Sequence, residues 1–348
     1  MSPSTLHIAI LDTDTPVPTV LAKRGLYSDI FTSLLQDASS RLSWPTITTT
    51  AYDIVAGLYP PTALLPTLSG ILITGSAASS YDKTPWVQLL DAWISFIYVN
   101  YPKIKIFGSC FGHQIVCQSL LREYGVRVER DGSGWEVGVH EIRLAKEFLG
   151  AFSAMKSTGM KEAGKELKQL PTPDDTPSPT SSPSAEASAA DPSILRLQFV
   201  HADHVVLTPS HHSPAPFSLP SDWVLLGSTP HCHCQGVYQP SRILTFQGHF
   251  EFDRFVNSET IKIFGKIAGW DDARVKEVLE AIDADDDSLR AAEMVVKFFA
   301  DAAGPAVQSS HRPIKATQAS KPRGVQKQTK EKMRRSGRIE ARSRPLLK

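Results

Sequence analysis

The sequence predicts an α/β protein with an open, mostly parallel sheet and flanking helices. Short apolar segments alternate with helical patterns along the first 125 residues, which is typical of βαβ units. A cysteine stands between two glycines at 108–112, directly after an apolar segment and before a helical pattern. The chain of 348 residues is 41% hydrophobic and 21% charged, which suits a globular domain with a sizeable core.

The first half contains four expected strands and three expected helices. The strands are apolar or β-branched runs bounded by turn residues, at 6–11, 47–55, 70–75 and 103–109. Helical patterns cover 23–35, a segment that starts at Pro85, and 112–125. Thr84 can cap the second of these helices, and its apolar face repeats at helical spacing: Trp86, Leu89, Leu90, Trp93, Ile94 and Ile97.

The second half predicts further strands and helices in the same domain. Strands are expected at 135–145, 193–206, 223–229 and 241–250, and helices at 253–269 and 287–304. Residues from about 156 to 193 are rich in Pro, Ser, Thr and Ala and have almost nothing to bury, which predicts a disordered insertion. We therefore expect one domain over 1–304, interrupted by this insertion, and a basic disordered tail over 305–348.

The net charge of +1 conceals an acidic body with a basic tail. Residues 309–348 hold 13 Lys/Arg and 2 Asp/Glu, whereas residues 1–308 hold 24 Lys/Arg and 34 Asp/Glu. Such a tail is either a solvated disordered segment or a binder of importin or polyanions. It has no aromatic residue to stack on a base, so sequence-specific reading of nucleic acid is not expected.

The remaining composition favours a cytoplasmic protein, with the nucleus as an alternative through the basic tail. No apolar run reaches the roughly eighteen residues that a membrane helix needs. The N-terminal segment "MSPSTLHIAILDTD" lacks the features of a signal peptide. Four cysteines do not form a disulfide framework, which favours a reducing compartment.

The segment "GSCFG" at 108–112 has the form of a nucleophile elbow, where glycines allow a sharp strand-to-helix turn. This turn places the Cys110 sulfur at the carboxyl end of a strand, where α/β sheets bind ligands. The helix N-terminus favours a thiolate there, and the Phe111 N–H points toward a forming oxyanion. The alternative is a buried structural cysteine, which many free cysteines are.

A cysteine nucleophile needs a base, and the base needs an orienting group. His249 follows an expected strand in "TFQGHFEFD", and Glu251 stands two residues later. In an extended segment, positions i and i+2 project to the same side, so Glu251 can reach one imidazole nitrogen and leave the other for Cys110. Each residue alone could equally be a solvated turn residue.

Five segments resemble, in order, the motifs of the class I glutamine amidotransferases. They are "ITGSAASSYD" at 73–82, "GSCFGHQ" at 108–114, "GWEVG" at 134–138, "HADHV" at 201–205 and "QGHFEF" at 247–252. The resemblance covers about residues 6–270 and is greatest to the stand-alone, GMP-synthetase-amidotransferase-like branch, which includes γ-glutamyl peptidases. It implies a flavodoxin-like open sheet and assigns no cofactor.

The resemblance also implies a role for each matching residue. Cys110 would be the nucleophile, His249 the base and Glu251 the acid that orients the base. Gly75 and Phe111 would supply the N–H groups of the oxyanion hole. The pocket for glutamine or a γ-glutamyl group would be lined by Gln114, Trp135, Glu136, Val137 and Gly138.

The implied reaction is hydrolysis of a γ-glutamyl amide through a γ-glutamyl thioester, with glutamine or a glutathione-type compound as the small-molecule substrate. The chain has no recognisable synthetase segment, so a separate ammonia-accepting synthetase is one expected partner. Two alternatives stay open, a γ-glutamyl peptidase and a catalytically degenerate or partner-dependent subunit. Phe250 stands where the family usually has proline, which can alter the loop that presents His249.

Weaker signals favour structural interpretations. "HCHC" at 231–234 alternates across a strand, so its four side chains cannot converge on a metal, and no metal is expected. "GMKEAGKE" at 159–166 lacks the Ser/Thr of a phosphate-binding loop. His201 and Asp203 favour a local hydrogen-bonded pair over a catalytic role. The 139 residues between Cys110 and His249 exceed the family's usual gap, and the insertion accounts for much of the excess.

Overall fold

The computed structural model describes residues 5–154, 191–207 and 219–301. The segment at 159–166 and the tail at 305–348 lie outside the described residues, as does the expected insertion apart from its last three residues. Disorder of the insertion and tail therefore stays a prediction, as do the domain limits.

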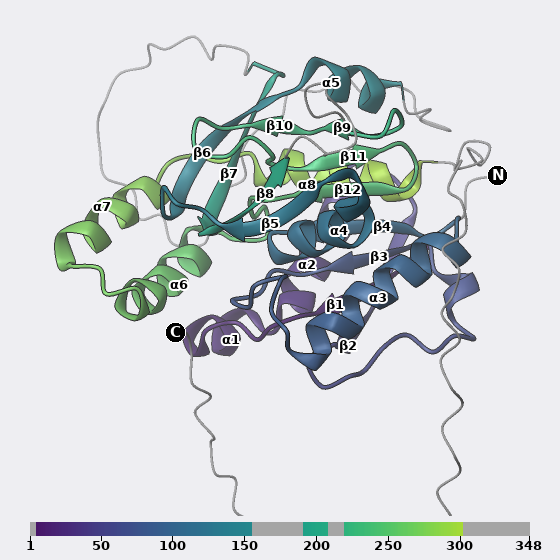
Figure 1. The fold of residues 1–348 in the computed structure, drawn as a ribbon, viewed down its shortest axis with the longest axis horizontal. Helices are drawn as coiled ribbons and strands as arrows, with labels where there is room; N and C mark the ends of the chain where they lie inside the picture. The colour runs from purple at the N-terminus through teal and green to yellow at the C-terminus, as the bar shows by residue number, and fades with distance from the viewer. Residues whose placement is uncertain (1–4, 155–190, 208–218, 302–348) are drawn as a thin grey trace, which may run out of the picture. The chain divides into compact units, whose positions relative to one another are not determined.

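The central sheet has seven strands in the order β2-β1-β3-β4-β12-β11-β9 (Figure 1). The bounds are β1 Thr5–Asp12, β2 Thr46–Asp53, β3 Gly70–Ile73, β4 Lys105–Ser109, β9 Val224–Leu225, β11 Val237–Gln239 and β12 Ile243–Phe246. The first five strands in this order pair in parallel, and β11 is antiparallel to both of its neighbours. The predicted open, mostly parallel sheet is confirmed.

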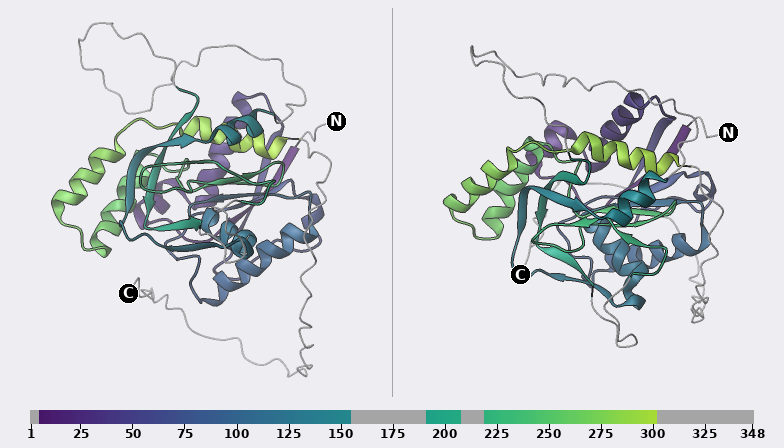
Figure 2. Two further views of the ribbon diagram at one scale, coloured as in Figure 1. Left: turned by 45° about the horizontal axis from the view of Figure 1, so that its top comes forward. Right: turned by 90° about the horizontal axis from the view of Figure 1, so that it is seen from above.

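Helices cover both faces of this sheet (Figures 1 and 2). Their bounds are α1 Pro18–Arg24, α2 Tyr27–Arg41, α3 Pro85–Asn100, α4 Phe111–Leu121, α5 Lys146–Ser153, α6 Arg254–Ile267, α7 Asp272–Ile282 and α8 Ser288–Ala300. Short 3-10 helices span Leu65–Thr67 and Arg122–Tyr124. Helices α1, α5 and α7 have no counterpart among the predicted elements.

The alternation of side chains along β1 explains why both faces are covered. Ile8 and Ile10 lie in a core cluster with α2 and α8, whereas Ala9 and Leu11 lie in a second cluster with α3 and α4. Successive side chains of a strand point to opposite faces. The continuous apolar run from Ile8 to Leu11 therefore requires helices on both sides, which is the layered α/β arrangement.

Two small antiparallel sheets lie beside the central one. One contains β6 Glu136–Leu144, β7 Ile194–His201 and β10 Gly227–Ser228; the other pairs β5 Val126–Arg130 with β8 Asp203–Leu207. The strand predicted at 193–206 thus breaks at Ala202 and contributes to both sheets. A third apolar cluster joins α6 and α7 to Val137 and Val200, so these two helices pack against the outer side of β6 and β7.

Candidate active site

Cys110 stands at the junction between β4 and α4, at the carboxyl end of the parallel strands. It caps the N-terminus of α4 with φ 49 and ψ −105, a left-handed conformation that costs energy for a residue other than glycine. Its backbone N–H donates to the Phe246 carbonyl at 2.8 Å, and only 6% of the residue is exposed. The strained turn and its location agree with the elbow that the sequence predicts.

The two glycines of the elbow are required by close backbone contacts. A Cβ at Gly112 would lie 2.3 Å from the Ile73 carbonyl oxygen, and a Cβ at Gly108 would lie 2.5 Å from the backbone of Gly112. Helix α4 therefore begins directly against the end of β3. No side chain fits between them, which explains the spacing of glycines around the cysteine.

His249 and Glu251 form a buried hydrogen-bonded pair next to Cys110. The Nδ1 atom of His249 lies 2.7 Å from Oε1 of Glu251, and both residues are at most 3% exposed. The His249 N–H donates to the Gln198 carbonyl of β7 at 2.8 Å. The Phe252 ring stacks on the imidazole at 4.1 Å with an interplanar angle of 18°. Backbone pairing and stacking together hold the ring in one orientation.

A serine that the sequence analysis did not single out also holds the carboxylate. Ser109 donates its hydroxyl to the same Oε1 of Glu251 at 2.9 Å. The residue precedes Cys110 in the elbow, and its side chain is fully buried. The strand that leads into Cys110 thus also holds the carboxylate that bonds to His249.

The electrostatics of the site favour a charged imidazole. Burial lowers the pKa of His249, but the Glu251 carboxylate and the Cys110 thiolate raise it by more, so this pKa lies above its ordinary value. The Nε2 atom of His249 is buried and makes no hydrogen bond among the described residues. A proton at this nitrogen is therefore available to a group bound at the sulfur.

Phe250 points away from the site. Its side chain is 1% exposed and packs edge-on against Phe31 at 5.4 Å and Phe107 at 5.8 Å. Because His249 and Glu251 stand on the opposite side of the extended segment, this phenylalanine leaves their hydrogen bond intact. The departure from the family's proline is thus absorbed by the hydrophobic core.

The loop after β3 completes one wall of the site. A Cβ at Gly75 would lie 3.1 Å from Cε1 of His249 and 3.6 Å from Cβ of Cys110. The hydroxyl of Thr13 donates to the Gly75 carbonyl at 2.9 Å and fixes this backbone. Phe111 is the first residue of α4, where N–H groups have no carbonyl partner within the helix. The Gly75 backbone therefore lies near the side chain of Cys110, and the role of Gly75 and Phe111 as oxyanion-hole donors stays a prediction.

Gln114 is buried against the site by two hydrogen bonds. Its Nε2 donates to the Asp203 carbonyl at 2.9 Å and to Oε1 of Gln247 at 3.1 Å. Gln247 was not among the predicted site residues. A signal was present, because Gln247, His249 and Glu251 are spaced by two and share one side of an extended segment.

Three residues of the "GWEVG" segment make packing contacts, and the role of this segment in the substrate pocket stays a prediction. Trp135 packs edge-on against Trp270 at 5.7 Å, and Val137 lies in the cluster under α6 and α7. Gly138 has φ 90, and a Cβ there would lie 2.7 Å from Cβ of Ala281. This glycine therefore lets helix α7 approach β6.

Glu136 lies in a buried polar network. Its carboxylate accepts hydrogen bonds from Thr229 at 2.6 Å and Gln235 at 2.8 Å, and lies 2.9 Å from Nε2 of His201. Nδ1 of His201 faces the Asp203 carbonyl at 3.0 Å. Burial raises the pKa of the Glu136 carboxyl, but these partners lower it by more, to about 2. The predicted local bonding of His201 is thus present, with Glu136 as an additional partner.

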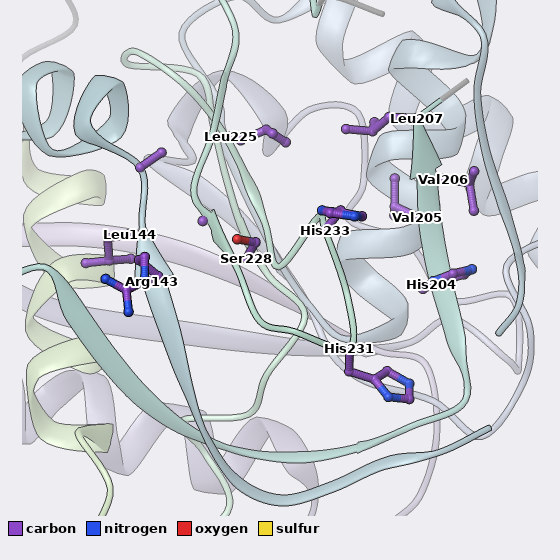
Figure 3. A pocket seen from close by; sticks show the side chains of 12 residues that line it. Arg143, Leu144, His204, Val205, Val206, Leu207, Leu225, Ser228, His231 and His233 are labelled. Atoms are coloured by element: carbon purple, nitrogen blue, oxygen red, sulfur yellow. The ribbon is translucent and has the colours of Figure 1, made fainter. Parts of the chain in front are cut away.

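A separate cavity of about 610 Å³ lies beside β6, β8 and the segment after β10 (Figure 3). Cys110, His249 and Glu251 are not among its lining residues. Two of its histidines, His204 and His231, share the carboxylate of Asp131 at 3.0 and 3.3 Å.

Over 5–154, 191–207 and 219–301, no group of three or more His, Cys, Asp or Glu side chains is arranged to hold a metal ion. Within those ranges no helix is long and apolar enough to cross a membrane.

Comparison with known proteins identifies the family. No family model matches the chain. A glutamine amidotransferase-like protein of Schizosaccharomyces pombe is 30% identical over 299 residues, which cover 84% of this chain and 98% of that protein. γ-Glutamyl peptidase 4 of Arabidopsis thaliana is 30% identical over 124 residues, 35% of this chain and 44% of the peptidase. The crystal structure of a glutamine amidotransferase from Thermotoga maritima aligns with 84% of this chain and 94% of its own, at 16% identity and a TM-score of 0.48. The chain therefore belongs to the class I glutamine amidotransferase-like family.

Proposed function

We propose that this protein is a cysteine-dependent γ-glutamyl amide hydrolase of the glutaminase or amidotransferase type. The observation that carries the proposal is the buried assembly at the elbow. Cys110, in its strained turn, is close enough to His249 to raise the pKa of the imidazole, and Glu251 lies 2.7 Å from Nδ1 of His249. A nucleophile, a base and an orienting acid in this order are what acyl transfer requires.

The proposed reaction has two acyl-transfer steps. The Cys110 thiolate attacks the γ-carbonyl carbon of the substrate, and the backbone N–H groups of Gly75 and Phe111 stabilise the oxyanion, at about 3 kcal/mol for each donor. The C–N bond then breaks, and His249 gives its proton to the departing amine. Water next adds to the γ-glutamyl thioester while His249 accepts one of its protons. The C–S bond breaks, and glutamate leaves.

The test is release of glutamate from glutamine and from γ-glutamyl peptides by the purified chain. We expect C110S to lose at least about 10⁴-fold in kcat. The matched control is C232S, because Cys232 is also buried but makes its contact with the Cys234 carbonyl. A folded wild-type protein that releases no glutamate from either substrate class would contradict the proposal.

A γ-glutamyl peptidase activity is the second candidate, and the named γ-glutamyl peptidase among the relatives favours it. Both activities use the same thioester, so they differ only in the leaving group. The ratio of kcat/KM for a γ-glutamyl peptide to that for glutamine separates them.

The passage of ammonia to a separate synthetase is a further proposal about this site. Cross-linking and co-purification with the full chain test it. If the amount of ammonia released into solution equals the amount of glutamate formed when cell extract is present, the transfer of ammonia to a synthetase is contradicted.

A further inference from the structure

Gln247 brings a neutral amide against the nucleophile. Its Nε2 lies 3.5 Å from the Cys110 sulfur, and the residue is fully buried. It directly follows β12, whose last residue, Phe246, accepts the Cys110 N–H. The Gln247 N–H donates to the Gln235 carbonyl at 2.9 Å. Backbone bonds thus anchor both residues of the contact.

The direction of this amide follows from its neighbours. The Asp203 carbonyl can only accept, so the group of Gln114 that faces it at 2.9 Å is the nitrogen. The same nitrogen faces Gln247 at 3.1 Å, so the Gln247 atom at that contact is the oxygen. The NH₂ group of Gln247 is therefore the one that faces the sulfur.

We propose that Gln247 is a catalytic residue whose amide N–H stabilises the Cys110 thiolate, and that Gln114 is the positioning residue that fixes its direction. This inference rests on the proposed function, in which Cys110 is the nucleophile. Hydrogen bonds to ionised groups are about twice as strong as those between neutral groups. The amide therefore favours the thiolate over the thiol without adding charge.

The same contact serves both steps of the reaction. In the first step it increases the fraction of Cys110 that is ionised before attack. In the second step the C–S bond of the thioester breaks and its electron pair returns to sulfur, where the amide N–H meets the forming thiolate. His249 has by then accepted a proton from water, so the amide and the imidazolium stabilise the leaving sulfur together.

Other titratable groups around the sulfur act in parallel with the amide. His249, from the loop after β12, and Tyr27, from the start of α2, interact electrostatically with Cys110. Glu251 acts through His249, because its carboxylate lies 2.7 Å from Nδ1 of that residue. Asp12 and Asp14 lie near the Tyr27 hydroxyl. The contribution of Gln247 must therefore be measured as a difference between variants in which all of these groups are kept.

The experiment is the pH dependence of Cys110 alkylation by iodoacetamide in substrate-free protein, read by mass spectrometry of the Cys110 peptide. We expect Q247M to move the midpoint upward by about one pH unit, which is about tenfold less thiolate below the midpoint. Q247E preserves volume but places a carboxylate at the sulfur, so we expect an upward shift at least as large. Q239M is the matched control, because Gln239 is also buried but bonds to Tyr98.

The role of Gln114 has its own readout. If it positions Gln247, Q114M shifts the alkylation midpoint in the same direction, and the double variant shifts it no further than Q247M. Midpoints of Q247M and Q247E that equal the wild-type value, in variants that unfold at the same temperature as Q239M, overturn the proposal. If the alkylation midpoint of Q114M equals the wild-type value, the positioning role of Gln114 is overturned.

These outcomes are distinct from failure of the proposed function, because alkylation needs no turnover. If the alkylation midpoints shift but the protein releases no glutamate, the thiolate contact of Gln247 is supported and the proposed hydrolase function is contradicted. If the protein releases glutamate but the midpoints do not shift, the hydrolase function is supported and the role of Gln247 is contradicted.

Discussion

The buried carboxylate of Glu136 provides a sharp test of whether the "GWEVG" segment serves the substrate or the fold. The substitution Glu136→Gln keeps the shape of the side chain and removes its charge. Both ring nitrogens of His201 face acceptors, the Glu136 carboxylate and the Asp203 carbonyl. The Glu136 carboxylate also accepts hydrogen bonds from Thr229 and Gln235. The substitution puts a neutral amide among these three partners and removes the charge that they stabilise.

The expected loss of stability follows from the pKa shift. The pKa of the Glu136 carboxyl falls from 4.5 to about 2 on folding, and each unit corresponds to about 1.4 kcal/mol. The carboxylate thus contributes about 3 kcal/mol to the free energy of unfolding at neutral pH. Because its folded pKa is the lower one, this contribution is present above pH 4.5 and is lost as the pH falls toward 2.

Urea unfolding of wild type and E136Q at about pH 7 and about pH 3.5 measures the effect. We expect a difference of about 3 kcal/mol at the higher pH and a smaller one at the lower pH. Equal unfolding free energies at neutral pH, together with a raised KM for the γ-glutamyl substrate, would contradict a stabilising role for Glu136 and assign it to substrate binding.

Three further substitutions test the elbow and the His249 loop. S109A removes the donor to the catalytic carboxylate and should lower kcat about tenfold at constant KM; an unchanged kcat contradicts this. G112A places a Cβ 2.3 Å from a backbone oxygen of β3 and should lower the melting temperature sharply, whereas G132A meets nothing within 4 Å and serves as control. F250A should cost about 3–5 kcal/mol in the free energy of unfolding. The control F96A, at a side chain 44% exposed, should cost much less in the same urea titration.

Much of the site was predictable from local patterns. The positions of β4 and α4 follow from an apolar run, two glycines and a helical repeat, all within residues 103–125. The pairing of His249 with Glu251 follows from the two-residue period of an extended segment. Both depend on neighbours in the chain, which the sequence displays directly.

The "GWEVG" segment has neighbours that are distant in the sequence. Its role in the substrate pocket stays a prediction, and the structure shows in addition that Val137 and Gly138 pack against α6 and α7. The periodicity of residues 272–282 was not singled out, so the helix that requires Gly138 was missing from the prediction. Without that neighbour, a glycine in a strand suggests a ligand as readily as a close helix.

The α/β class, the cysteine turn and the local His–Glu pair could be read from the sequence, because each depends on residues a few positions apart. That the two motifs meet depends on the tertiary structure. Strands β4 and β12 are parallel neighbours, with Gly108 opposite Thr245 and Ser109 opposite Phe246. Their carboxyl ends therefore deliver Cys110, Gln247 and His249 to one point across 139 residues of chain. Strand order depends on non-local packing of both sheet faces, which no local period encodes.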